Sequence, residues 1–146
     1  MGSRTGRTPQ KSLVRISSEL VGTPYRLGGT TDALDCFSLI VRYLGMKGIT
    51  VPPDLVFKGH AISDYPEEYE VDPKKMIWVA VEYIASITTE LPVHKTMAGD
   101  ILFVRTEDNE SLVINGGNGV IIAATKDRGT VVLDEHEYIT QRVFRC

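Results

Sequence analysis

Cys36 is the residue in this chain of 146 whose position most favours chemistry. It comes one or two residues into a helix predicted by the apolar residues between 39 and 44, directly after a loop that contains Gly28 and Gly29. The N–H groups at a helix start have no partners within the helix, so they favour a thiolate and can hold an oxyanion. Cys36 is therefore a candidate nucleophile. The alternative interpretation is a small buried apolar side chain, as most free cysteines are.

The elements that position Cys36 predict an α+β fold with helices first and strands after them. Apolar residues at helical spacing predict helices over residues 10–21, from Cys36 onward, and from Met76 to shortly before Pro92. An antiparallel sheet of about five short strands is expected at residues 101–105, 112–115, 120–125, 130–133 and 142–144. Gly-rich segments at 115–119 and 126–129 predict hairpin turns within this sheet.

Charge is unevenly distributed along the chain. Residues 1–15 carry four basic and no acidic side chains, and residues 1–9 are interpreted as a flexible basic arm, or as an arm that docks on an acidic partner. Residues 54–72 carry six acidic side chains and one lysine, and are interpreted as a surface loop that would dock the domain in an assembly. Residues 10–146 are expected to form a single domain.

The composition excludes several classes of protein. Lys and Arg total 16 against 19 Asp and Glu, a net charge of −3, whereas a general nucleic-acid-binding protein needs a basic excess. No apolar run approaches the roughly 20 residues of a membrane span, and no signal peptide is expected. Two cysteines are too few for a disulfide scaffold. The scattered histidines and cysteines lack metal-ligand spacing, so we expect neither a metal nor a cofactor.

A longer pattern surrounds Cys36. Residues 22–29 read G-T-P-Y-R-L-G-G and are followed, after a short loop, by D-C at the helix start. This run resembles the signature of the NlpC/P60 family of cell-wall cysteine peptidases. Residues 98–103, A-G-D-I-L-F, resemble the P-G-D-L-V-F strand that opens the family's sheet. The resemblance covers nearly the whole chain in the expected order and implies a papain-like α+β fold.

The resemblance also implies roles for individual residues. In that family the cysteine attacks an amide of the peptidoglycan stem peptide, a histidine on the second strand acts as the base, and a polar residue on the next strand orients the histidine. It follows from the resemblance that Cys36 occupies the nucleophile position, with Tyr25 beside it in the cleft and Asp35 recognising the free amine of the substrate. Phe37 occupies a binding position where the family commonly has serine.

Two positions depart from the family pattern. The second strand usually reads H-V-G-I-Y-x-G-N-G, whereas residues 111–119 read S-L-V-I-N-G-G-N-G, so Ser111 stands at the base position. Ala123 stands at the third position, where the family reads I-H-A. A serine does not accept a proton near neutral pH as an imidazole does. Loss of both partners removes on the order of 10³ or more in rate, so we expect impaired catalysis.

The three histidines lie elsewhere in the sequence. His60 falls in the acidic segment, His94 precedes the first strand and His136 lies near the last turn, and all three are interpreted as solvated surface residues. His94 is the best candidate for a displaced base. Cys146 is interpreted as a free surface thiol, and Trp78 as a core or helix-packing residue.

The function follows from the same resemblance. Residues 35–41, D-C-F-S-L-I-V, resemble the phage branch of the family, which often reads D-C-W-G-L-V. This implies a catalytically impaired, structural component of a phage tail tip, located in the virion and cytoplasmic before assembly, with other tail proteins such as the hub as partners. One alternative is an active peptidoglycan endopeptidase that uses Cys36 with a displaced or partner-supplied base. Another is a small intracellular binding domain with no viral connection.

Overall fold

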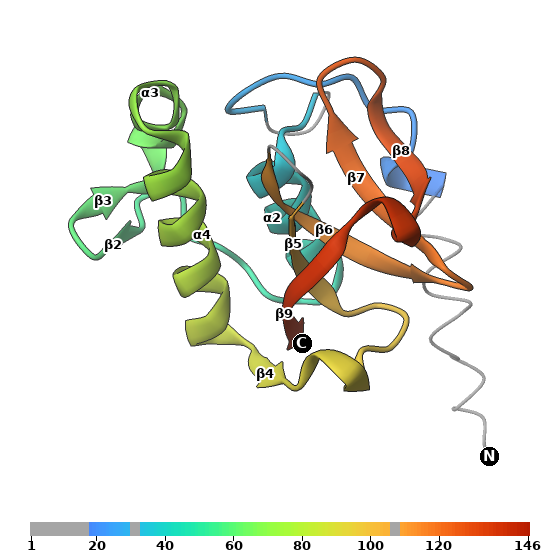
Figure 1. The fold of residues 1–146 in the computed structure, drawn as a ribbon. Coiled ribbons are helices and arrows are strands. Elements are labelled where there is room, and N and C mark those ends of the chain that lie inside the picture. The colour runs from blue at the N-terminus through green and yellow to red at the C-terminus, as the bar shows by residue number, and fades with distance from the viewer. Residues whose placement is uncertain (1–17, 30–32, 106–108) are drawn as a thin grey trace.

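Helices pack against a curved antiparallel sheet in the computed structural model, which describes residues 18–29, 33–105 and 109–146 (Figure 1). The α+β fold class is thereby confirmed. Residues 18–20 are helical and are followed by a turn, as expected for the end of the first predicted helix. The rest of that helix and the basic arm lie outside the described residues.

The main sheet has six strands in the order β4-β9-β5-β6-β7-β8, each antiparallel to its neighbours. Its strands are β4 (Thr89–Leu91), β5 (Ile101–Arg105), β6 (Glu110–Gly117), β7 (Val120–Thr125), β8 (Gly129–Asp134) and β9 (Ile139–Arg145). The prediction of about five strands is one too few. It misses β4, a three-residue edge strand whose residues were predicted to be the end of a helix. The short 3-10 helices η2 (Val93–Lys95) and η3 (Glu135–Glu137) lie in the connections.

The C-terminal strand lies inside the sheet, whereas in a simple meander it would lie at an edge. β9 pairs with β4 on one side and with β5 on the other, so the chain returns to the start of the sheet before it ends. The two predicted hairpin turns connect β6 to β7 and β7 to β8. Gly117, Asn118 and Gly119 all have positive φ in the first of these turns, which explains the choice of Asn and Gly there.

Helix α2 (Cys36–Met46) presents an apolar face to the sheet. Leu39, Ile40, Tyr43 and Leu44 are each fully buried on this face. The hydroxyl of Tyr43 donates a hydrogen bond to the carbonyl oxygen of Gly99, just before β5. The buried apolar face and the hydrogen bond of Tyr43 together fix the position of α2 relative to the sheet.

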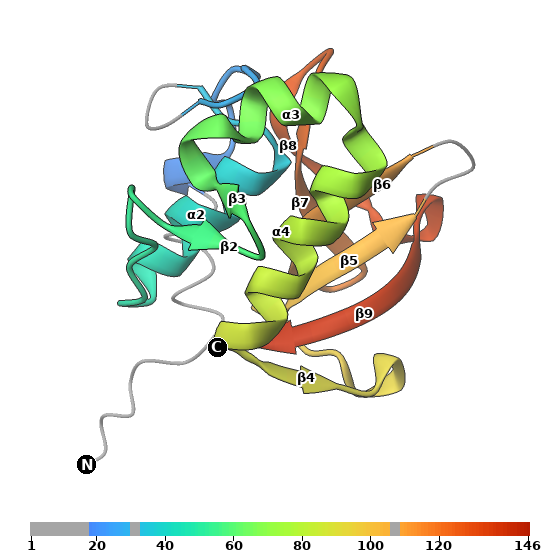
Figure 2. The same ribbon diagram turned by 90° about the vertical axis from the view of Figure 1, so that its left-hand side faces the viewer.

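Helix α4 (Pro73–Ile87) runs diagonally across the molecule, with helix α3 (Tyr65–Val71) above it (Figure 2). It begins three residues before the predicted start at Met76, because Asp72 caps it by accepting a hydrogen bond from the N–H of Lys75 at 3.2 Å. Pro73 then occupies the first helical position, where its missing N–H costs nothing. The helix ends at Ile87, and the chain turns directly into β4.

The acidic segment is folded, so its interpretation as a surface loop is wrong. It forms the hairpin β2 (Val56–Phe57) and β3 (His60–Ala61), the 3-10 helix η1 (Ile62–Asp64), and helix α3 (Tyr65–Val71). In α3, Glu67 and Glu70 are exposed while Tyr65 is buried and Tyr69 is partly buried. The carboxylates therefore face solvent and the aromatic rings face the protein, an amphipathic pattern that the high net charge of the segment hides.

Two apolar cores lie on the two faces of the sheet. The larger core joins α2, α3 and α4 to side chains such as Phe103, Leu112 and Ile114. The smaller one contains alternate residues of the same strands: Leu102, Val104, Val113, Ile121, Ala123 and Val143. This alternation shows that β5 and β6 are buried on both faces.

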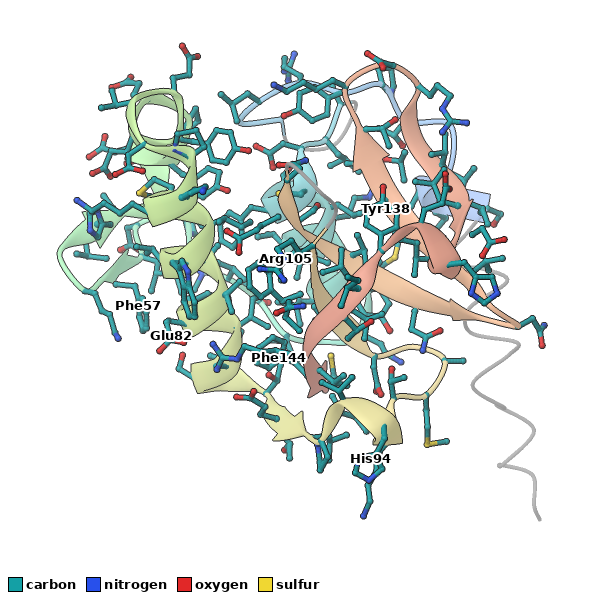
Figure 3. All side chains as sticks on the ribbon, viewed as in Figure 1. Phe57, Glu82, His94, Arg105, Tyr138 and Phe144 are labelled. Atoms are coloured by element: carbon teal, nitrogen blue, oxygen red, sulfur yellow. The ribbon has the colours of Figure 1, made fainter. Side chains whose placement is uncertain are left out.

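An ion-pair network fastens α4 to the sheet. Arg142 of β9 binds Glu82 of α4 at 2.7 Å and Glu90 of β4 at 2.8 Å, and its guanidinium lies 5.8 Å from the ring centre of Trp78. Figure 3 shows Glu82 on α4 and Phe144 on β9 near this contact. Trp78 is 47% exposed and packs against the ring of Phe103 at 6.0 Å, so it is a helix-packing residue rather than a fully buried core residue.

The loop before α2 approaches α3 closely at Gly28. This residue has φ +75°, and a Cβ atom there would lie 2.5 Å from Cγ of Pro66 on α3. We predict that Gly28→Ala lowers the free energy of unfolding by about 2–4 kcal/mol, because strain at positive φ adds to steric overlap. Urea denaturation measures this loss.

The matched control is Gly48→Ala, since Gly48 has φ +85° but open space around the position of its Cβ. Its cost is expected to be about 1 kcal/mol, from backbone strain alone. Equal losses for the two variants would contradict close packing between the loop and α3.

Candidate functional site

The start of α2 is built around the carboxylate of Asp35, the N-cap residue. One carboxylate oxygen accepts a hydrogen bond from the N–H of Ser38 at 2.7 Å, and the other accepts one from the N–H of Gly28 at 2.7 Å. The hydroxyl of Ser38 accepts in turn from the N–H of Asp35 at 2.7 Å, which completes a capping box. Asp35 is 2% exposed, so it orders both the helix start and the preceding loop from inside the protein.

Backbone pairing also holds this loop. The N–H of Leu34 donates to the carbonyl oxygen of Pro24 at 2.8 Å, and the N–H of Arg26 donates to the carbonyl oxygen of Leu34 at 3.2 Å. Tyr25 and Leu34 thus form a parallel bridge. The bridge places Tyr25 opposite Leu34, which comes directly before the N-cap residue Asp35.

The thiol of Cys36 lies at the first turn of α2 among polar groups from two other elements. The backbone of Leu112 and the hydroxyl of Ser111, both on β6, and the hydroxyl of Tyr65 on α3 interact with it and lower its pKa. Burial has the larger opposite effect and, together with the charge of Asp35, raises the pKa of the thiol to about 11. The site therefore holds a neutral thiol at neutral pH.

Ser111 thus lies beside the cysteine. Ala123 packs in the smaller core with Val113. A methyl group in that position offers no hydrogen bond to a neighbour. The roles assigned to Ser111 and Ala123 stay predictions.

Two tyrosines from α3 complete the surroundings of the thiol. The pKa of Tyr65, of Tyr69 and of Tyr25 is raised, chiefly by burial and then by the charges of Cys36 and Asp35, which places all three phenols near the thiol. Sequence reasoning missed the two on α3. The signal was present, since D-Y-P-E-E-Y at residues 64–69 combines a proline in the first turn, acidic residues after it and tyrosines four apart.

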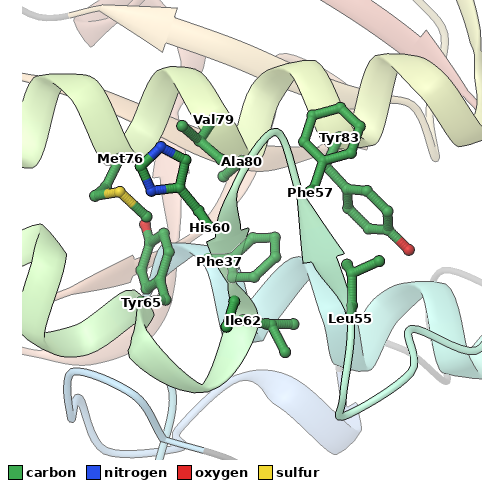
Figure 4. A pocket seen from close by; sticks show the side chains of 11 residues that line it. Phe37, Leu55, Phe57, His60, Ile62, Tyr65, Met76, Val79, Ala80 and Tyr83 are labelled. Carbon is green, nitrogen blue, oxygen red and sulfur yellow. The ribbon is translucent and has the colours of Figure 1, made fainter.

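Phe37 and Tyr65 form the wall between α2 and α3. Their ring centres are 4.9 Å apart, and Tyr65 also stacks on Tyr69 at 5.6 Å. Phe37 is 7% exposed and, with Tyr65, lines a small cavity beneath the β2–β3 hairpin (Figure 4). These are the contacts of a packing residue. The predicted role of Phe37 in binding stays a prediction.

No histidine in the described part of the chain is among the groups that interact with the thiol. His60 pairs with Glu68 of α3 at 2.9 Å and lies in the cavity of Figure 4, so its interpretation as a solvated residue is wrong. His94 is exposed on η2, at the lower end of the molecule and away from α2 (Figure 3). His136 is exposed on η3. Cys146 is an exposed free thiol, as expected.

The family is decided by comparison with known proteins. The model of the NlpC/P60 family matches residues 22–146, nearly the whole chain. The chain belongs to the NlpC/P60 family. No curated protein matches the chain in sequence. Among the described residues, no helix is long and apolar enough to cross a membrane, and no three His, Cys, Asp or Glu side chains group as metal ligands do.

Solved NlpC/P60 domains share the fold at low sequence identity. The NlpC/p60 domain of the peptidoglycan hydrolase SagA is 20% identical, with a TM-score of 0.60 over 94% of this chain and 98% of that one. RipD from Mycobacterium tuberculosis, described as a non-catalytic NlpC/p60 domain protein adapted to peptidoglycan binding, is 12% identical, with a TM-score of 0.57 over 95% and 98%. The P60 domain of antigen MAP1204 from M. avium subspecies paratuberculosis is 16% identical, with a TM-score of 0.57 over 97% and 96%.

The central place of Asp35 in the site leads to a stability prediction. Asp35→Ala removes the cap of α2 and leaves the N–H of Gly28 without its acceptor, so the free energy of unfolding should fall by about 2–4 kcal/mol. Asp72→Ala is the matched control, because Asp72 caps α4 through one longer hydrogen bond at an exposed position. It should cost about 0.5–1 kcal/mol. Equal losses in urea denaturation would show that Asp35 does no more than cap a helix.

Proposed function

We propose that this NlpC/P60 domain binds the peptidoglycan stem peptide without cleaving it and serves as a structural component of a phage tail tip. The observation that carries the proposal is the surroundings of Cys36: two hydroxyls, a backbone group and a buried carboxylate, with the pKa of the thiol raised to about 11. At pH 7 such a thiol is ionised in about one molecule in ten thousand. The cysteine is kept at the nucleophile position, but it is not ionised to the reactive thiolate.

The missing base explains why the thiol stays protonated. In a cysteine peptidase a neighbouring imidazole takes the proton and stabilises the thiolate as an ion pair. Ser111 provides a hydroxyl at this point, which donates or accepts a hydrogen bond but does not hold a proton near neutral pH. The likeness in fold to RipD, described as non-catalytic, supports a domain that retains the cleft for binding.

The assignment to a phage tail rests on the run D-C-F-S-L-I-V at residues 35–41, which resembles the phage branch of the family. Helix α3 offers a surface for docking on another tail protein such as the hub. Its outer side exposes Glu67 and Glu70, and Asp64 and Asp72 flank it, also exposed. In this proposal the protein is cytoplasmic until the tail is assembled and then part of the virion.

The loss of hydrolysis is tested on purified peptidoglycan. We expect the wild-type chain and Cys36→Ala to release equal, background amounts of peptide, as measured by mass spectrometry of the soluble fraction. Ser111→His is the informative companion, because an imidazole beside the thiol should speed alkylation of Cys36 at pH 7 by tenfold or more. Release of peptide by the wild-type chain that disappears in Cys36→Ala would establish the active endopeptidase instead.

The place in the tail is tested on purified particles of a phage that encodes the chain. We expect the chain among the virion proteins by mass spectrometry, and antibodies against it to bind the tail tip in electron micrographs. Tails from a phage with a stop codon in the gene should be incomplete, whereas Cys36→Ala should leave them intact. Particles that contain no copy of the chain would contradict the structural role.

A further inference from the structure

The hydroxyl of Tyr65 is buried without a hydrogen-bond partner. Tyr65 is 5% exposed, and its hydroxyl is one of two such atoms in the described residues, the other being that of Thr130 on β8. An unsatisfied buried hydroxyl lowers stability, and a phenylalanine in its place would keep the ring packing without that loss. The hydroxyl is therefore a feature that packing alone does not explain.

The position of this hydroxyl links it to the site. Stacking on Phe37 and Tyr69 holds the ring, and Pro66 packs next to it against Gly28. The hydroxyl lies close enough to the thiol of Cys36 to lower its pKa, although it makes no hydrogen bond of good geometry there. The ring packing thus holds the hydroxyl of Tyr65 in place, close to the point where a bound molecule would contact Cys36.

The chemistry around Tyr65 selects the kind of group it would bind. The pKa of Tyr65 is raised far above its usual value, chiefly by burial, so the phenol keeps its proton and acts as a donor. The buried carboxylate of Asp35 nearby disfavours a second anion. The acceptor that fits is an uncharged carbonyl oxygen, such as that of a peptide amide.

The thiol and several side chains near it are accessible to solvent. Tyr25, Tyr69, Ser111 and Cys36 itself are all partly exposed, whereas Tyr65 is buried. A peptide that enters between these side chains would reach the thiol first and the hydroxyl of Tyr65 next to it. The ligand carbonyl would then replace the weak contact between hydroxyl and thiol.

We propose that Tyr65 of α3 is a specificity-determining residue of this site and donates a hydrogen bond to an amide carbonyl of the bound stem peptide. This rests on the proposed binding function. Tyr65 comes from the folded acidic segment rather than from the loop that holds Tyr25. Helix α3 therefore contributes a side chain to the site in addition to its exposed acidic surface.

Isothermal titration calorimetry with a muropeptide that carries the stem peptide tests the proposal. Tyr65→Phe should bind about 3- to 10-fold more weakly than the wild-type chain, the worth of one hydrogen bond. Its melting temperature should be unchanged or higher, because the ring is kept and an unsatisfied hydroxyl is removed. Tyr83→Phe is the matched control, because it also removes a phenolic hydroxyl from a buried ring, here on α4. Burial raises the pKa of Tyr83, and Cys36 does not contribute to this shift. It should bind as the wild type does.

The outcomes separate the two claims. Binding by Tyr65→Phe within twofold of the wild type, or a loss of binding that accompanies a lower melting temperature, overturns the role of Tyr65 and leaves the binding function standing. Absence of any binding by the wild-type chain at millimolar muropeptide overturns the proposed binding function, and the role of Tyr65 with it.

Discussion

The buried carboxylate of Asp35 is the constraint on which the site depends. With one oxygen it caps α2 and with the other it holds the turn at Gly28, so the helix and the loop cannot be placed independently. Its charge also acts on the neighbouring thiol and phenols and adds to the effect of burial, which favours their protonated forms. One side chain thus fixes the geometry of the site and contributes to its electrostatics.

In the proposed function, this dual effect explains how the NlpC/P60 fold is kept while the cysteine does not cleave the bound peptide. A helix start favours a thiolate by a modest amount, through backbone N–H groups and the dipole. Burial and a nearby negative charge oppose it, and without an imidazole they prevail. Ser111 adds a hydroxyl to this site, and in the proposed function the site holds a neutral peptide without attacking it.

Helix α3 gives the acidic segment two distinct faces. Glu67 and Glu70 are exposed to solvent, while Tyr65 packs on Phe37 and Tyr69 stacks on Tyr65. The pair between His60 and Glu68 at 2.9 Å ties the β2–β3 hairpin to the same helix. The segment therefore links an outer surface suited to a partner with the wall of the site.

The parts of this site that lie close together in the sequence could be predicted, and the parts brought together by folding could not. Asp35 and Cys36 are adjacent and follow a glycine loop, so local rules place them at a helix start. Ser111 could be assigned to the base position only through the resemblance to the family, by alignment on the Gly-Asn-Gly at residues 117–119. The run D-Y-P-E-E-Y at residues 64–69 indicates a helix, but nothing in it places Tyr65 near Cys36, because that placement depends on the packing of α3 against Gly28. The edge strand β4 is too short to show a periodic pattern, and the insertion of β9 beside it depends on long-range pairing.

The protonation state of Cys36 is the most direct test of this account. The chemical shift of its Cβ carbon, followed by NMR in protein with labelled cysteine, reports thiol or thiolate, and Cys146→Ser assigns the two signals. The account predicts a thiol throughout the neutral range, with a titration midpoint near the pKa of about 11 that burial and Asp35 impose. A midpoint below pH 8, and hence a thiolate at neutral pH, would contradict it.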